Sequence, residues 1–169
     1  MMRLFIALEP SPEFRNALSV LQNNLRTAGV SGRYLEPSGL HLTLAFIGMW
    51  PENIAALLPH VQQPFVITLS GTGLFPKADV LWAGITPSGP LNELARNVRT
   101  VLSEAGIPFD RKAFNPHITL VRKPRMPKET VLSGVRVPPA EMIVRGVCLY
   151  RSERGENGME YTVIGRSGQ

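Results

Sequence analysis

The sequence predicts an α+β protein made of two copies of one unit, with mostly antiparallel sheets and the helices outside. Two observations lead to this fold class. First, the chain repeats itself: Ala28-Gly29-Val30 returns as Ala105-Gly106-Ile107, and His41-Leu42-Thr43-Leu44 returns as His117-Ile118-Thr119-Leu120. Second, each copy places a short apolar strand before an amphipathic helix. We therefore expect a single bilobal domain over residues 1–169, built from repeats of about 1–79 and 80–169 that an approximate twofold relates.

Each copy begins with a strand and a helix. The strands are expected at about residues 3–9 and 80–86. Ser11 and Ser88 are suited to cap the helices that follow, and Gly29 and Gly106 to end them. The apolar stripes of the two helices correspond one to one and are expected in the core: Phe14, Leu18, Leu21, Leu25 and Ala28, then Leu91, Ala95, Val98, Leu102 and Ala105.

The rest of each copy is predicted as follows. A short helix is expected over residues 51–61, with a weaker counterpart near 127–133. Further strands are expected over residues 65–75, 141–151 and 159–166. Glu156-Asn157-Gly158 has the composition of a hairpin turn.

The two His-x-Thr units lie in predicted strands, whose side chains alternate between faces. Strict alternation places His41, Thr43 and Ala45 on one face, and Leu42, Leu44 and Phe46 on the other. It likewise places His117, Thr119 and Val121 together. Because the large apolar groups must face the helices, the histidines and threonines are expected to meet in one cleft between the halves.

This constellation suits acid–base chemistry on a phosphate. One imidazole can accept a proton while the other donates one, and two threonine hydroxyls can bond the phosphate oxygens. Carboxylate clusters of the kind that bind Mg²⁺ are missing near the motifs, so we expect no metal and no cofactor. A single His-x-Thr is usually structural, but its recurrence at equivalent positions favours a function. His60 has no counterpart and is interpreted as structural.

The chain carries 18 basic and 13 acidic residues, and the basic excess lies in its second half. A stretch without acids contains Arg111, Lys112, Arg122, Lys123, Arg125 and Lys128. This stretch is either a solvated surface or a patch that attracts a polyanion such as RNA. Four aromatic side chains are candidates for stacking on an unpaired base, although packing is the more common role of such residues: Tyr34, Trp50, Trp82 and Phe114.

Composition also argues against a disulfide-bonded, a secreted or a membrane-spanning protein. With Cys148 as its one cysteine, the chain can form no internal disulfide, and we expect no Cys-based metal site. It has no apolar run of 18 residues and no signal-peptide pattern at its start. We expect a cytoplasmic protein without membrane contact, and a monomer, since the repeat already supplies an internal twofold.

These residues together resemble the 2H phosphoesterase superfamily, and within it the RNA 2′,3′-cyclic phosphodiesterases, also called 2′-5′ RNA ligases. The resemblance rests on the paired His-x-Thr units with their flanks and covers nearly the whole chain. Its other segments are Arg3-Leu4-Phe5-Ile6-Ala7-Leu8, Asn115-Pro116 before the second motif, Val121-Arg122 after it, and Tyr161-Thr162-Val163-Ile164.

The resemblance implies a bilobal fold with a central cleft and metal-independent hydrolysis of RNA 2′,3′-cyclic phosphate ends to 2′-phosphates. It also implies joining of tRNA halves through a 2′-5′ bond in some relatives. By analogy His41 protonates the departing 3′ oxygen and His117 activates water, although exchanged roles stay open. Thr43 and Thr119 hold the phosphate, and Arg122 is a further contact, ranked lower because strict alternation turns it away.

Two alternatives to this function stay open at the level of sequence. The first is a phosphodiesterase that acts on a small cyclic nucleotide, since its chemical core would be the same. The second is an RNA-binding module in which the histidines have no catalytic role.

Overall fold

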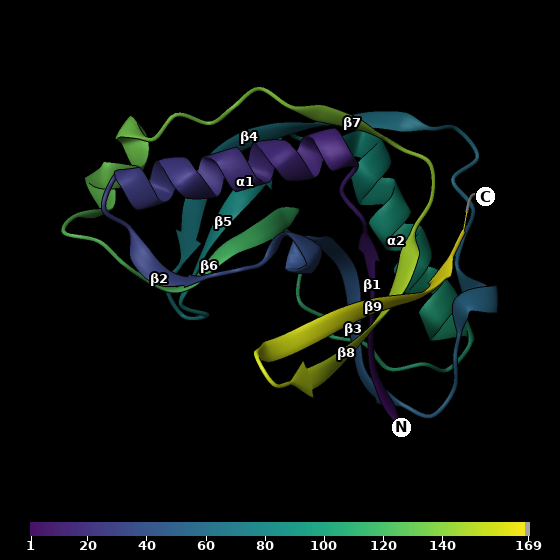
Figure 1. The fold of residues 1–169 in the computed structure, drawn as a ribbon. Coiled ribbons are helices and arrows are strands. Elements are labelled where there is room, and N and C mark those ends of the chain that lie inside the picture. The colour runs from purple at the N-terminus through teal and green to yellow at the C-terminus, as the bar shows by residue number, and fades with distance from the viewer. Residues whose placement is uncertain (168–169) are drawn as a thin grey trace.

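The computed structural model describes residues 1–167, without the side chain of residue 129, and two helices lie outside two antiparallel sheets (Figure 1). The helices are α1 (Pro12–Thr27) and α2 (Gly89–Glu104), and short 3-10 turns cover Pro37–Gly39, Ala55–Leu57 and Glu129–Gly134. Neither helix is long and apolar enough to cross a membrane. The strands are β1 (Met2–Leu8), β2 (Ser31–Tyr34), β3 (Leu42–Trp50), β4 (Phe65–Phe75), β5 (Val80–Ile85), β6 (His117–Arg125), β7 (Glu141–Val144), β8 (Cys148–Gly155) and β9 (Gly158–Arg166).

The two helices are capped as the sequence predicts. The Ser11 hydroxyl accepts a hydrogen bond from the Phe14 amide, and Ser88 does the same for Leu91, both at 3.2 Å. At the other ends Gly29 and Gly106 have positive φ angles of 96° and 72°. The predicted stripes are buried except at their last positions, where the two alanines are the exposed C-caps.

The two sheets do not coincide with the two sequence repeats. One sheet has the order β3-β1-β8-β9, and the other β2-β6-β5-β4-β7. Strand β8 of the second repeat therefore pairs with β1, the first strand of the first repeat, and β4 of the first repeat pairs with β5, the first strand of the second. The helices are exchanged too, because α1 packs on β6 and β7 while α2 packs on β3 (Figure 1). This exchange ties the two lobes together through one continuous apolar core.

A second, smaller cluster lies on the face of the four-stranded sheet that points away from that core. It consists of Phe5, Ala7, Cys148 and Tyr150, with Phe46, Tyr161 and Val163 packed against it. Leu4, Ile6 and Leu8 of the same strand β1 belong to the main core. The alternation along β1 therefore separates a core face from a second face, which is lined largely by aromatic rings.

Two element predictions are wrong. No α-helix forms over residues 51–61: a 3-10 turn spans Ala55–Leu57, where the Asn53 side chain accepts a hydrogen bond from the Ala55 amide at 2.9 Å and competes with helical hydrogen bonding. The strand expected over 141–151 is two strands, β7 and β8, that join different sheets. The chain crosses between the sheets at Arg145–Val147, around Gly146.

The other element predictions fare better. The counterpart near 127–133 is a 3-10 turn, and β8 and β9 join at the predicted hairpin, where Gly158 has a φ of 112°. Strand β2 was not predicted. Its sequence, Ser31-Gly32-Arg33-Tyr34, has no apolar alternation, and it is stabilised by pairing with β6.

Candidate functional site

The two His-x-Thr units lie at the starts of two strands that contact one another. His41 directly precedes β3, and His117 is the first residue of β6. Strands β3 and β6 belong to different sheets and are in contact. The two imidazoles are close enough for His117 to affect the pKa of His41. The fold thus brings together the two histidines that are 76 positions apart in the sequence.

Each unit is followed by a β-bulge that strict alternation cannot foresee. The β1–β3 register passes from Ala7 opposite Thr43 to Ile6 opposite Ala45, which leaves Leu44 unmatched. The β5–β6 register passes from Trp82 opposite Thr119 to Leu81 opposite Val121, which leaves Leu120 unmatched. The two bulges occupy equivalent positions in the repeat, and each shifts the faces of the residues that follow it, in β3 as far as a second register shift at Ile47.

The bulges correct three expectations about which residues face the cleft. Ala45 and Val121 belong to the main core and do not share a face with the histidines. Phe46, expected in the core, packs against the aromatic cluster on the second face. Thr43 and Thr119, which precede the bulges, are partly exposed as expected.

The bulge at Leu120 also changes the face on which Arg122 lies. It lies opposite Val80, which belongs to neither apolar cluster, while the preceding Val121 is in the core. Arg122 is therefore on the face of Thr119 and His117, and its charge is the first of three that lower the pKa of His41. The reason for ranking Arg122 low, strict alternation, does not hold.

A helix side chain holds the backbone at each bulge. Gln22 of α1 donates from its amide nitrogen to the carbonyls of Leu120 and Leu35, at 3.0 and 2.9 Å. Arg99 of α2 donates from Nε to the Leu44 carbonyl at 3.3 Å. Gln22 and Arg99 occupy equivalent positions in the two repeats, and each helix serves the motif of the other repeat. The sequence analysis predicted neither residue. Gln22 is a polar residue on the buried face of α1, and Arg99 is a charged residue that is partly buried in α2.

Arg99 also links the two motifs. It donates to the Lys112 carbonyl at 2.8 Å, in the loop that leads to His117. In the same loop the Asp110 amide donates to the Phe46 carbonyl of β3 at 2.8 Å. The approach to the second motif is therefore anchored on the strand of the first.

His41 is packed among aromatic rings. Its ring centroid lies 4.6 Å from Phe5, 5.2 Å from Tyr161 and 5.6 Å from Tyr150. Burial lowers the pKa of His41 to about 4, against the opposing effect of the Gly39 carbonyl, and the charges of Arg122, His117 and Arg15 lower it further. Its Nδ1 is buried and makes no hydrogen bond of normal geometry within the described residues. His41 is therefore neutral at pH 7 in the free protein.

His117 has a different environment. Its Nδ1 lies 2.6 Å from the Asn115 carbonyl and, because a carbonyl only accepts, carries the proton. In the neutral ring Nε2 is then the free acceptor. The edge-to-face neighbour is Phe75, at 4.9 Å and 84°.

The aromatic side chains near the histidines are mostly not those singled out in the sequence. Trp82 is the exception: it lies opposite Thr119 and packs 5.3 Å from Phe75. Tyr34 donates to the Val30 carbonyl under the Arg26 guanidinium. Trp50 and Phe114 pack against the main core. Phe5, Phe75, Tyr150 and Tyr161 were missed because a single apolar or aromatic residue in a strand carries no signal of the face that it takes.

Part of the basic stretch over 111–128 is neutralised. Arg125 pairs with Asp79 at 3.0 Å, and Lys112 lies 3.9 Å from Asp110. Arg122 enters no ion pair among the side chains described in residues 1–167. Arg122, on the face of the second motif, is thus one of the charges of this stretch that no ion pair offsets.

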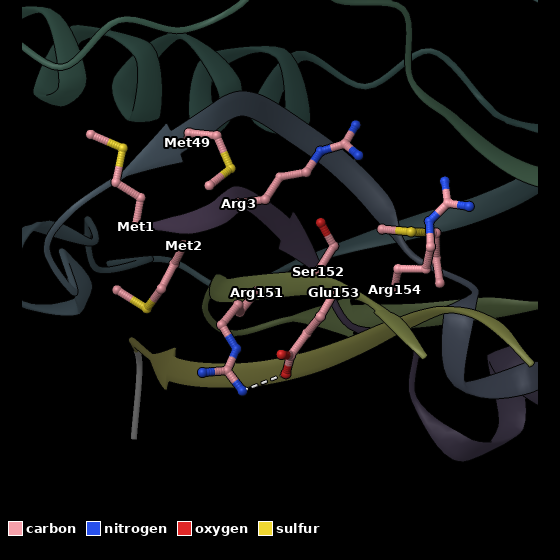
Figure 2. Close-up of a pocket in the computed structure, with 9 residues that line it drawn as sticks. Met1, Met2, Arg3, Met49, Arg151, Ser152, Glu153 and Arg154 are labelled. Atoms are coloured by element: carbon pink, nitrogen blue, oxygen red, sulfur yellow. Dashed lines mark hydrogen bonds and ion pairs between the residues drawn. The ribbon is translucent and has the colours of Figure 1, made fainter. Parts of the chain in front are cut away.

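Two hollows flank the aromatic face of the four-stranded sheet. One, of about 510 Å³, adjoins His41 through the rings of Tyr150 and Tyr161 and is also lined by Arg15 and Arg166. The other, of about 340 Å³, lies at the far end of the same strands (Figure 2). There Arg3 and Arg154 extend to one side, and Arg151 pairs with Glu153. Among the side chains that the structure describes, no three of the His, Cys, Asp or Glu type gather as metal ligands.

Comparison with known proteins agrees with this architecture. The family model described as the 2′-5′ RNA ligase superfamily matches residues 10–156. The RNA 2′,3′-cyclic phosphodiesterase of Thermus thermophilus is 34% identical over 96% of this chain and 88% of its own length. The RNA 2′,3′-cyclic phosphodiesterase of Escherichia coli is 28% identical over 97% of this chain and 94% of its own length.

Solved structures show the same fold. A crystal structure from T. thermophilus superposes with a TM-score of 0.76 at 36% identity, covering 98% of this chain and 97% of that one. The crystal structure of E. coli LigT complexed with 3′-AMP superposes with a TM-score of 0.77 at 26% identity, covering 98% of this chain and 96% of that one. The fold is that of the two-histidine phosphoesterases, which confirms the predicted α+β class. The chain belongs to the 2′-5′ RNA ligase superfamily, and the resemblance drawn from its paired motifs is confirmed.

Proposed function

We propose that this protein hydrolyses RNA 2′,3′-cyclic phosphate ends to 2′-phosphates, with His41 and His117 as the acid–base pair. The observation that carries the proposal is the meeting of two equivalent His-x-Thr units where β3 contacts β6. Relatives named RNA 2′,3′-cyclic phosphodiesterases support the same activity.

In the proposed reaction a water oxygen attacks phosphorus and the bond to the 3′ oxygen breaks. His117 Nε2 takes the proton of the water, since its Nδ1–H is committed to the Asn115 carbonyl. His41 gives a proton to the departing 3′ oxygen. Thr43 and Thr119 donate hydrogen bonds to the remaining phosphate oxygens, and Arg122 compensates their negative charge.

The donor role requires that His41 gain a proton as substrate binds. In the free protein burial, together with nearby positive charge of which Arg122 is the first, keeps it neutral, with a pKa of about 4. A bound phosphodiester brings a negative charge among those neighbours and raises the pKa. Proton uptake is thus coupled to binding, and an anionic ligand binds more tightly as the pH falls toward 4.

The test is incubation with an RNA oligonucleotide that ends in a 2′,3′-cyclic phosphate, in excess EDTA, beside the His41→Ala/His117→Ala double variant. Conversion to a 2′-phosphate by the unaltered protein alone supports the proposal. Complete loss in EDTA that a divalent metal restores would contradict the metal-independent reaction. Turnover of adenosine 2′,3′-cyclic phosphate without turnover of RNA would favour a small cyclic nucleotide, and unchanged RNA binding without any turnover would favour a binding module.

The two roles can be separated by the leaving group. A 4-nitrophenolate leaves without a proton, whereas an alcohol needs one. On bis(4-nitrophenyl) phosphate, His41→Ala should keep far more of its activity than His117→Ala. The reverse ranking would exchange the two roles.

Joining of tRNA halves through a 2′-5′ bond stays a prediction, which is tested by adding RNA with a 5′-hydroxyl end. That the protein is monomeric and cytoplasmic is likewise a prediction.

A further inference from the structure

The five-stranded sheet has an edge strand, β2, for which the other sheet has no counterpart. Strand β2 is held to β6 by ladder pairing and by the Leu35 amide, which donates to the Leu120 carbonyl at 3.0 Å. Gln22 supports the same junction through the Leu35 carbonyl. A feature that is present in only one lobe is a candidate for the recognition of an asymmetric substrate.

Register places Arg33 of β2 on the cleft side. Tyr34 lies opposite Val121, a core residue, and packs against the main core. Arg33 lies directly opposite Arg122 and therefore shares its face, which also carries Thr119 and His117. Directly opposite residues of antiparallel strands are about 5 Å apart at Cα.

Two arginines in this position repel one another. Like charges directly opposite in a sheet destabilise it. None of the ion pairs among the side chains described in residues 1–167 includes Arg33 or Arg122. Arg33 is exposed, so its guanidinium is available to a ligand. The arrangement favours a ligand that brings negative charge to both guanidinium groups.

We propose that Arg33 binds the internucleotide phosphate on the 5′ side of the terminal nucleotide, beside Arg122, which faces the cyclic phosphate. The inference rests on the proposed function, which places the cyclic phosphate between the histidines. Arg122 is near that phosphate, and Arg33 lies one strand further out, at the open edge where the RNA chain would leave the cleft. Arg33 is then a specificity residue that makes an oligonucleotide a better substrate than a nucleoside cyclic phosphate.

The experiment compares two substrates: adenosine 2′,3′-cyclic phosphate, and the dinucleotide that carries one additional 5′ phosphodiester. The unaltered protein should show a kcat/KM at least about tenfold higher on the dinucleotide. Arg33→Gln should lower kcat/KM about tenfold on the dinucleotide and at most about threefold on the mononucleotide. Arg33→Lys, which keeps the charge, should recover most of the preference. Arg96→Gln, an exposed arginine of α2, is the matched control and should change neither.

Salt dependence gives an independent readout. Each phosphate contact of a single strand contributes roughly −0.7 to the slope of log affinity against log salt. Arg33→Gln should reduce the slope by about that amount for the dinucleotide and leave the mononucleotide slope in place. The melting temperature of Arg33→Gln should not fall, because the substitution removes the repulsion between Arg33 and Arg122.

Three results would overturn the inference. One is an equal loss on both substrates, which would place Arg33 at the reacting phosphate or in the fold. Another is an Arg33→Gln variant that keeps the full dinucleotide preference. If the unaltered protein hydrolyses neither substrate, the proposed function itself fails, and the role of Arg33 fails with it.

Discussion

The two His-x-Thr strands have the same geometry and different surroundings. In each the histidine lies at the N-terminal end of the strand, a bulge directly follows the threonine, and a helix side chain holds the bulge carbonyl. Yet His41 lies among three aromatic rings, whereas His117 bonds the Asn115 carbonyl and contacts Phe75. The repeat thus determines where the two histidines lie, and the neighbouring strands determine the surroundings of each ring.

Exchange of strands produces this difference. The rings around His41 come from β1, β8 and β9, and two of these strands lie in the second repeat. The ring beside His117 comes from β4, in the first repeat. Each motif is therefore completed by the other half of the chain. For this reason similarity between the motifs does not imply similarity between the sites.

The largest expected effect is the removal of either imidazole. His41→Ala and His117→Ala should each lower kcat/KM by roughly 10²- to 10⁴-fold, the usual contribution of a positioned acid or base. Because the two act in one step of the proposed reaction, the double variant should be far less impaired than the product of the single losses. Single-turnover kinetics on a cyclic-phosphate oligonucleotide measures all three. A variant that keeps more than about a tenth of the activity would remove that histidine from the reaction.

The next effect concerns stability in acid, to which the burial of His41 should contribute. Its pKa is about 4 in the folded protein and near 6.5 when unfolded, so between these values the unfolded state binds a proton that the folded state does not. Stability should therefore fall by about 3 kcal/mol as the pH drops from 6.5 to 4. His41→Gln should remove this share of the pH dependence, and His117→Gln should retain it.

Urea unfolding of the two variants and the unaltered protein at several pH values measures the difference. Histidine NMR gives the same titration directly, with a His41 midpoint near 4 that inorganic phosphate shifts upward. A His41 midpoint at its ordinary value would mean that the aromatic packing does not desolvate the ring. The contrast between the two motifs would then be lost.

The threonines should be nearly equivalent, because both precede a bulge and both are partly exposed. Thr43→Val and Thr119→Val should each cost roughly 1–3 kcal/mol of transition-state stabilisation through the lost hydroxyl donor. The measurement is kcat/KM at the pH optimum, with Thr100→Val, an exposed threonine of α2, as the control. Unchanged kinetics in both motif variants would mean that neither hydroxyl bonds the phosphate.

Sequence reasoning predicted the elements whose signals are local. Ser11, Ser88, Gly29 and Gly106 mark the helix ends through chemistry within a few residues, and the structure confirms them. The bulges at Leu44 and Leu120 depend on pairing between strands, so no pattern along β3 or β6 alone reveals them. The wrong faces for Ala45, Phe46, Val121 and Arg122 all follow from that one omission.

Strand β2 and the exchange of β4 and β8 were missed for a related reason. Ser31–Tyr34 is a strand only because β6 offers an open edge and Gln22 satisfies the Leu35 carbonyl. Internal similarity shows that two units exist, but a strand has the same sequence whichever sheet it joins. The pairing of His41 with His117 could be inferred because it requires only that the repeat be real.

The smallest effect distinguishes the two helix side chains that hold the bulges. Gln22 is 3% exposed and makes two hydrogen bonds, so Gln22→Leu should cost about 1–2 kcal/mol of stability through the unpaired Leu35 carbonyl. Arg99 is only partly buried and water can replace it, so Arg99→Leu should cost about 0.5–1 kcal/mol. Asn97→Leu, on the exposed side of α2, should cost little.

Stability alone does not show that these residues position the motifs, so the kinetic pattern is the deciding measurement. If the bulge carbonyls set the directions of Thr43 and Thr119, both variants should lower kcat more than they raise KM, at a temperature where each is fully folded. Arg99→Leu should also affect the loop before His117, because Arg99 bonds both Leu44 and Lys112. Full kcat in both variants would show that strand pairing alone maintains the bulges, and that the two helices contribute only to the stability of the fold.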